Sequence, residues 1–245
     1  MKQNVLNQFN GWMLAVASVM LLSLGACDKN EPGGEKPKNL PDIDVKIEGT
    51  IDHQKLVEGQ KGSVTFNRFP ATVQEFKEVR EKIGKEPHGA VALQIMAYEM
   101  FRRNQRIGME CINLNSTNTN SGEKSSAVRQ LRLLFNNDNS SRPYQMAAYL
   151  KGATFENGYS PTKPYTVEVI VDKGRGYGYS NDYQAPIVKL LVLTKGKERP
   201  DPVALVKTKD PKESSEGKYF IVSECSSIYV RVRAIAFDHP FKGLD

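Results

Sequence analysis

The sequence predicts an α+β fold, in which an N-terminal helical region packs with a small C-terminal antiparallel β barrel. Two observations predict this order. In several segments before residue 152, apolar residues recur every three or four positions, as they do along one face of a helix. After residue 152, short segments rich in Val, Ile and Tyr alternate with Gly, Pro, Asp and Lys, as in a series of strands joined by turns.

Composition divides the chain into four regions. We expect a lipoprotein signal peptide at 1–26, a flexible tether at 27–42, a mainly helical domain at 43–152 and a small β-barrel domain at 153–245. The formal net charge of the 245 residues is only +6, and the basic residues are spread over many segments. A nucleic-acid-binding protein usually has a dense basic stripe, so nucleic acid is not an expected partner.

The N-terminal segment carries an apolar run from Gly11 to Gly25, shorter than the roughly 20 residues that span a bilayer. The run ends in Leu24-Gly25-Ala26-Cys27, which resembles the bacterial lipobox. The resemblance implies that the chain is cut before Cys27, that the Cys27 thiol is acylated, and that the protein is anchored to a membrane of the cell envelope. The alternative is a plain signal peptide followed by a chance cysteine.

The residues directly after Cys27 contain no apolar side chain before Leu40 and are rich in Pro, Gly and charge, in the stretch "DKNEPGGEKPKN". Such a segment cannot bury enough apolar surface to fold, which is typical of a tether. The first element of the folded body is a short strand, predicted by the alternation of Ile43, Val45 and Ile47.

Four helices are then expected. "PATVQEFKEVREKIG" predicts the first, with Thr72 and Glu75 as a capping box and Gly84 as its end. "PHGAVALQIMAYEMFRRN" is apolar nearly all round, which indicates a helix buried on most sides. A polar loop separates it from a third helix in "SAVRQLRLLFNND", and "RPYQMAAYLKG" predicts a short fourth one.

Five strands are expected after residue 152, at Tyr165–Val171, Ile187–Thr194, Val203–Thr208, Lys218–Ser223 and Ile228–Ala236. "GKYFIVSECSSIYVRVRA" resembles the end of SH3-like barrels, where a strand, one helical turn and a final strand follow one another, and "GKERPDP" resembles a loop of that barrel. Over about residues 45–237, including "YLKGATFENGYSPTKPYTV", the chain is similar to uncharacterised lipoproteins of Gram-negative gut bacteria. That likeness implies a fold and no mechanism.

The loop "DKGRGYGYSNDY" contains the candidate ligand contacts Arg175, Tyr177, Tyr179 and Tyr183. Tyrosine rings and a guanidinium group stack on sugars or on a partner's side chains, although the same residues could simply pack within a long hairpin loop. A phosphate site needs a helix directly after the glycines, whereas Pro186 and a strand follow here. We therefore expect no nucleotide cofactor.

The other chemistry-bearing residues form no convincing constellation. His53, His88 and His239 lack metal-ligand spacing, so no metal or other cofactor is expected. Cell-wall peptidases that use a cysteine nucleophile pair it with a downstream histidine, but only His239 follows Cys111. Cys111 and Cys225 are either free or joined by a disulfide, and both alternatives remain open.

The sequence therefore predicts an envelope lipoprotein that acts as a non-catalytic binding module. Its partners are the membrane, through the lipid, and peptidoglycan, a glycan or an envelope protein. Two alternatives stay open: an envelope hydrolase and a structural subunit of a surface complex. The hydrolase hypothesis requires that Cys111, His53 or His88, and an acidic group meet in one cleft.

Overall fold

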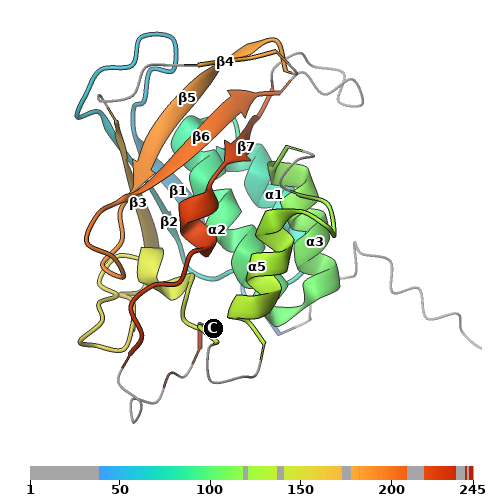
Figure 1. Ribbon diagram of the computed structural model, residues 1–245, viewed down its shortest axis with the longest axis vertical. Coiled ribbons are helices and arrows are strands. Elements are labelled where there is room, and N and C mark those ends of the chain that lie inside the picture. The colour runs from blue at the N-terminus through green and yellow to red at the C-terminus, as the bar shows by residue number, and fades with distance from the viewer. Residues whose placement is uncertain are drawn as a thin grey trace, which may run out of the picture. The chain divides into compact units, whose positions relative to one another are not determined.

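The computed structural model describes residues 39–117, 121–136, 141–172, 178–181, 183–208, 218–235, 241 and 243–244. All of them belong to one compact unit, Glu31–Asp245. Its elements follow one another along the chain as β1 (Val45–Gly49), β2 (Lys61–Phe66), α1 (Val73–Ile83), α2 (Pro87–Arg103), α3 (Gln105–Asn115), α5 (Ser126–Leu134), the 3-10 turn η1 (Ala147–Tyr149), β3 (Tyr165–Val171), β4 (Tyr179–Ser180), β5 (Ala185–Val192), β6 (Asp201–Lys207), β7 (Phe220–Glu224) and the 3-10 turn η2 (Ser226–Tyr229) (Figure 1). The signal peptide and Cys27 lie outside the described residues.

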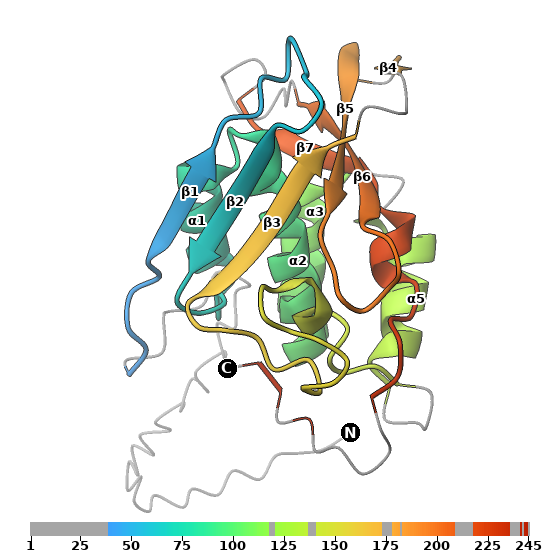
Figure 2. The same cartoon turned by 90° about the vertical axis from the view of Figure 1, so that its left-hand side faces the viewer.

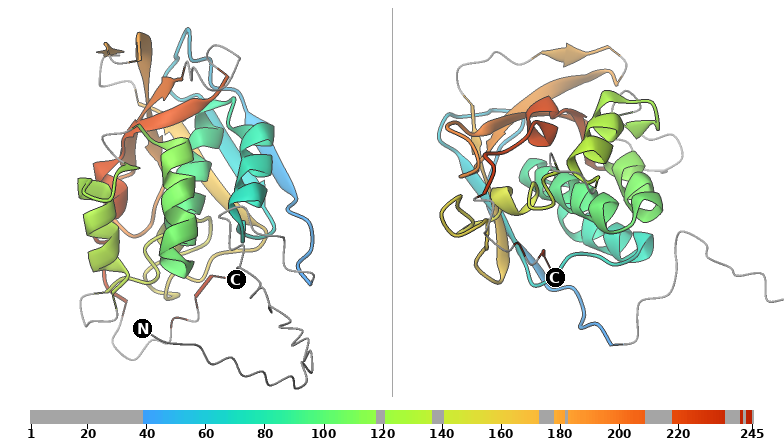
Figure 3. Two further views of the ribbon diagram at one scale, coloured as in Figure 1. Left: turned by 90° about the vertical axis from the view of Figure 1, so that its right-hand side faces the viewer. Right: turned by 60° about the horizontal axis from the view of Figure 1, so that its bottom comes forward.

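The unit has two layers, so the predicted α+β class is confirmed. The strands form one antiparallel sheet in the order β1-β2-β3-β5-β6-β7, and β4 pairs with β5. The helices pack against one face of this sheet (Figure 3). The opposite face, which we call the outer face, is turned toward the viewer in Figure 2 and has no described helix on it.

The sheet is open, so the predicted SH3-like barrel is not confirmed. No described pairing joins β1 to β7. The reason is that β2 pairs with β3, and β1 with β2, so these two strands from before the helices lengthen the sheet instead of leaving β3 to β7 to close on themselves. One sheet thus contains strands from both sides of residue 152.

Helix α1 is where it was predicted. The Thr72 side chain accepts a hydrogen bond from the Glu75 backbone N–H at 3.1 Å, and Gly84 follows the last turn. The Glu75 carboxylate accepts a bond from the Ala71 N–H at 2.8 Å and pairs with Arg68 at 2.5 Å. This buried ion pair fixes the segment that enters the helix.

Helix α2 is buried along nearly its whole length, as expected. Helix α3 was not predicted and lies against α2. Asn104 begins it by accepting hydrogen bonds from the N–H groups of Arg106 and Ile107. A Cβ atom at Gly108 would overlap the backbone of Phe101, so the two helices are in contact through their main chains at this point.

The third predicted helix is α5, and four of the five predicted strands correspond to β3, β5, β6 and β7 within two residues at each end. Two other predictions were wrong. Residues 142–152 form turns and only the short η1, and residues 228–235 form η2 and an extended segment without a strand partner. The side chain of Gln145 joins these segments by donating to the carbonyls of Ile228 and Val230 and accepting from the Val232 N–H. These bonds replace the strand pairing that the apolar pattern predicted.

Candidate functional site

A groove opens at the end of the sheet where β5 begins, β6 ends and β7 begins. The connection between β1 and β2 forms its other wall. Its volume is about 470 Å³, and we call it the loop groove. The residues that line it are His53, Gln54, Leu56, Pro186, Ile187, Val188, Lys207 and Phe220.

The lining of the loop groove is mainly apolar, with a few polar groups. The His53 ring packs edge-on against Phe220, with 5.0 Å between the ring centroids, and the Lys207 ammonium lies 5.5 Å from the centre of the same ring. Burial, and then the positive charge of Lys207, lower the pKa of His53 and so favour its neutral form. Ligand sites commonly combine an apolar lining with a few polar groups in this way.

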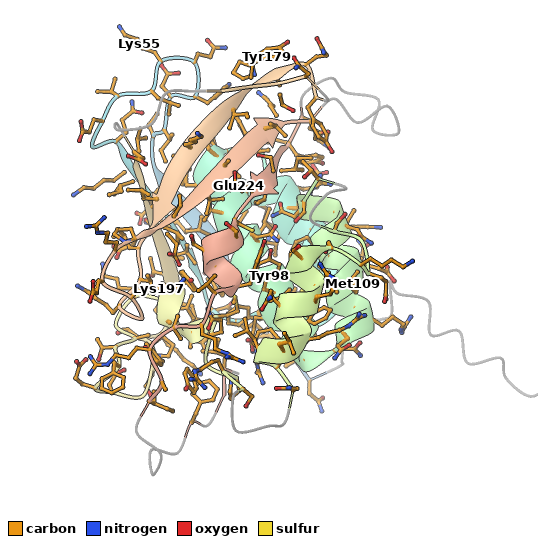
Figure 4. All side chains as sticks on the ribbon, in the orientation of Figure 1. Lys55, Tyr98, Met109, Tyr179, Lys197 and Glu224 are labelled. Carbon is orange, nitrogen blue, oxygen red and sulfur yellow. The ribbon has the colours of Figure 1, made fainter. Side chains whose placement is uncertain are left out.

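Tyr179, one of the four predicted contacts, lies at the border of this groove. Its strand β4 pairs with β5 through Tyr179 and Pro186, and the Tyr179 side chain is 55% exposed. Figure 4 shows Tyr179 and Lys55 at the same end of the sheet. Tyr183 is half-buried in the turn between β4 and β5, where its N–H donates to the Ser180 hydroxyl. Arg175 and Tyr177 lie outside the described residues.

Two further cavities, of about 330 and 430 Å³, lie along the outer face and share the lining residues Glu168 and Leu193. Both are lined in part by charged side chains: Glu48, Lys61, Lys151, Glu168, Lys195, Lys197 and Glu198. Lys151 and Glu168 pair with each other at 3.1 Å. These linings contain more charged side chains than that of the loop groove, in which Lys207 is the one described Lys, Arg, Asp or Glu side chain.

A buried polar cluster supports the wall of the smaller cavity. The Tyr149 hydroxyl donates to the Asp201 carboxylate at 2.5 Å, and the Lys197 ammonium donates to the same oxygen at 2.6 Å and to the Ser227 carbonyl. Burial, followed by the Asp201 charge, raises the pKa of Tyr149 well above its usual value. The cluster joins η1, β6 and η2. Its two charged groups, the Lys197 ammonium and the Asp201 carboxylate, form an ion pair with each other.

Cys111 and the histidines do not form a catalytic arrangement in the described chain. Cys111 is fully buried on α3, and burial strongly raises the pKa of its thiol. The charged groups that affect this thiol are Glu110 and Lys77. His88 is buried in the first turn of α2 under Gly62, whereas His53 is in the loop groove. None of the three cavities is lined by Cys111.

Cys225 is also free and buried, and its sulfur lies 3.1 Å from the Tyr98 hydroxyl. Burial raises the pKa of the Cys225 thiol to about 12. Within the described ranges, no three His, Cys, Asp or Glu side chains gather closely enough to hold a metal ion. The helices that the structure describes are too short or too polar to cross a bilayer.

Sequence reasoning singled out Tyr179 but missed the groove beside it. The loop groove brings together Leu56, Ile187 and Phe220, which come from three distant parts of the chain. The one local signal was the presence of His53 and Leu56 in the connection between β1 and β2.

The chain matches a known domain family over residues 68–236. No curated protein matches the chain, and no solved structure does. The matched range includes every described helix and the strands from β3 onward, whereas β1 and β2 precede it. It covers more than half of the chain, and the protein therefore belongs to the family described as a domain of unknown function, DUF6935.

Proposed function

We propose that this protein is a lipoprotein of the cell envelope, acylated on Cys27, whose folded unit binds another envelope component in the loop groove without catalysing a reaction. It would then be one of the uncharacterised lipoproteins of Gram-negative gut bacteria that its sequence resembles. The observation that carries the binding role is the apolar groove of about 470 Å³ next to the exposed ring of Tyr179.

The chemistry of the groove favours a protein among the three partner classes. Leu56, Ile187 and Phe220 offer apolar surface, which an apolar side chain of a partner covers better than a sugar does. Lys207 and Gln54 supply polar groups from the two walls of the groove, and the exposed ring of Tyr179 adds contact area at its border. Interfaces between proteins are typically enriched in aromatic anchors of this kind. Peptidoglycan and other glycans remain the alternatives to be tested.

The anchor is tested by labelling cells with an alkyne-bearing fatty acid. We expect the wild-type chain to incorporate the label and to sediment with membranes, and the Cys27→Ser variant to lose the label. Mass spectrometry of the mature N-terminus supplies a second readout. An unprocessed chain, or a processed one without fatty acid, would contradict the anchor and leave the groove untested by this experiment.

The groove is tested by photo-crosslinking in cells. A photoreactive phenylalanine analogue replaces Tyr179 in one strain and Leu133 in a control strain, since the Leu133 side chain on α5 is 50% exposed and outside the groove. We expect a discrete crosslinked species from position 179 that is lost when Ile187 is also changed to Glu. Identical products from both positions, or none from position 179, would refute binding at the groove. A parallel sedimentation with purified peptidoglycan tests the glycan alternative.

A further inference from the structure

We propose that β1 pairs with the β1 strand of a second copy of this chain, antiparallel and centred on Ile47, so that one sheet continues across two molecules. Among the described strands, β1 is the end of the sheet and pairs only with β2. Figure 2 shows it at the border of the sheet. The inference uses β1 alone and does not depend on what the loop groove binds.

The backbone of β1 leaves a regular row of groups on its open side. Asp44 and Asn67 are opposite each other, and the Asn67 N–H donates to the Asp44 carbonyl at 3.2 Å. In an antiparallel pair, alternate residues point their N–H and C=O groups to the partner strand and away from it. The groups of Val45, Ile47 and Gly49 therefore point away from β2 and are positioned to pair with another strand.

The side chains on either side of Ile47 carry opposite charges. Lys46 and Glu48 are 71% and 51% exposed and form an ion pair with each other at 2.7 Å. When two β1 strands are antiparallel about Ile47, Lys46 of each copy is opposite Glu48 of the other. Opposite charges directly across two strands stabilise the pairing, and like charges weaken it.

Within the strand Val45–Gly49, this charge pattern favours one register. A shift of two residues in one direction puts Lys46 opposite Lys46, and a shift in the other direction puts Glu48 opposite Glu48. A shift of one residue puts the outward groups of one strand opposite the inward groups of the other. An in-register parallel arrangement puts Lys46 beside Lys46. A register about Val45 puts Lys46 opposite Asp44, but it pairs only Val45 of the strand Val45–Gly49 with its counterpart. The antiparallel register about Ile47 satisfies the backbone and the charges and pairs the whole strand.

Charged residues on an edge strand usually discourage pairing with another chain. That protection is effective when the charges have one sign, because the two edges then repel each other in every register. Here Lys46 and Glu48 alternate in sign about a residue whose backbone faces outward. The edge is therefore complementary to itself and is expected to reject edges of a different charge pattern.

The test is co-purification of two differently tagged full-length copies expressed in one cell. We expect the wild-type copies to co-purify. Lys46→Glu in both copies puts the new carboxylate of each copy opposite Glu48 of the other. We then expect the apparent dissociation constant to rise about tenfold, since both cross-strand pairs change from attraction to repulsion. Glu48→Lys in both copies is expected to have the same effect, through repulsion between lysines.

Two combinations restore the complementarity. A Lys46→Glu copy should co-purify with a Glu48→Lys copy, and the double variant Lys46→Glu/Glu48→Lys should co-purify with itself. Lys55→Glu makes the same charge change in the β1–β2 connection and is the control, with recovery unchanged. Circular dichroism verifies that each variant is folded. Absence of wild-type self-association, insensitivity to Lys46→Glu, or failure of both restoring combinations would each overturn the proposal.

Discussion

The two faces of the sheet differ in what encloses them. Along β3, the residues directed toward the helices, Tyr165, Val167, Val169 and Val171, are all buried, whereas the residues between them are only half-buried. The helix-facing side is closed by tightly packed side chains, and the outer face has two cavities, each lined in part by charged groups. This difference indicates that apolar side chains buried on the helix-facing side contribute most of the free energy of folding. The outer face, the strand ends and the β1 edge are then available for binding.

The largest loss of stability is expected where α2 and α3 pack against each other through their main chains. Gly108→Ala adds a Cβ atom that would overlap the Phe101 backbone, so α2 and α3 must separate. We expect the free energy of unfolding to fall by about 3 kcal/mol, or the protein not to accumulate at all. Gly122→Ala is the matched control, because nothing lies within 4 Å of its added Cβ atom. Urea denaturation followed by circular dichroism measures both. Equal stability of the two variants would contradict the close contact of α2 with α3.

The next effect concerns a histidine buried on the helix-facing side. His88 is 1% exposed, and burial lowers its pKa to about 4 from 6.5. The unfolded chain therefore takes up a proton on this ring below about pH 6.5, and the folded chain does so only near pH 4. Stability that is present above pH 6.5 is lost as the pH falls toward 4, by at most roughly 3 kcal/mol at 1.36 kcal/mol per pKa unit.

The measurement is the free energy of unfolding in urea at pH values from about 4 to about 7.5, which span both pKa values of the His88 ring. In His88→Gln, the free energy of unfolding is expected to fall less as the pH is lowered over this range, even if the variant is less stable at neutral pH. His53→Gln is the comparison: burial also lowers the pKa of His53, but its ring is only partly buried in the loop groove, so this variant should reduce the decline less than His88→Gln. An unchanged pH dependence in His88→Gln would show that other groups cause the acid sensitivity.

Helices whose apolar residues follow a clear pattern, α1 and α2, could be predicted from the sequence, whereas α3 could not, although Asn104 caps it. Thr72 and the regular spacing of Val73, Phe76 and Val79 identify α1 without any tertiary information. The buried side of α3 includes Gly108 and Asn115, which do not count as apolar in a periodicity analysis. That helix exists because α2 packs against it, and this is a tertiary cause.

The strands show the same limit. β2 was missed because its helix-facing residues begin with Gly62, whose missing side chain makes room for the His88 ring at 2.6 Å from an added Cβ atom. The segment after η2 was predicted as a strand from its β-branched residues, but the distant Gln145 bonds its backbone. The loop groove could not be predicted for the same reason, since Leu56 and Phe220 meet only in the folded chain.

The smallest effect is expected on the outer face. Lys151 and Glu168 form an ion pair at 3.1 Å, with 61% and 36% of their side chains exposed. Lys151→Ala should change the free energy of unfolding by less than about 0.5 kcal/mol, because solvent screens exposed pairs and ordering them costs entropy. Glu75→Ala is the comparison on the helix-facing side, since it leaves the buried Arg68 guanidinium without its carboxylate partner, an ion pair only 9% and 7% exposed. If the two variants lost equal stability, the outer face would contribute to folding as much as the enclosed one, and the division between the two faces would be wrong.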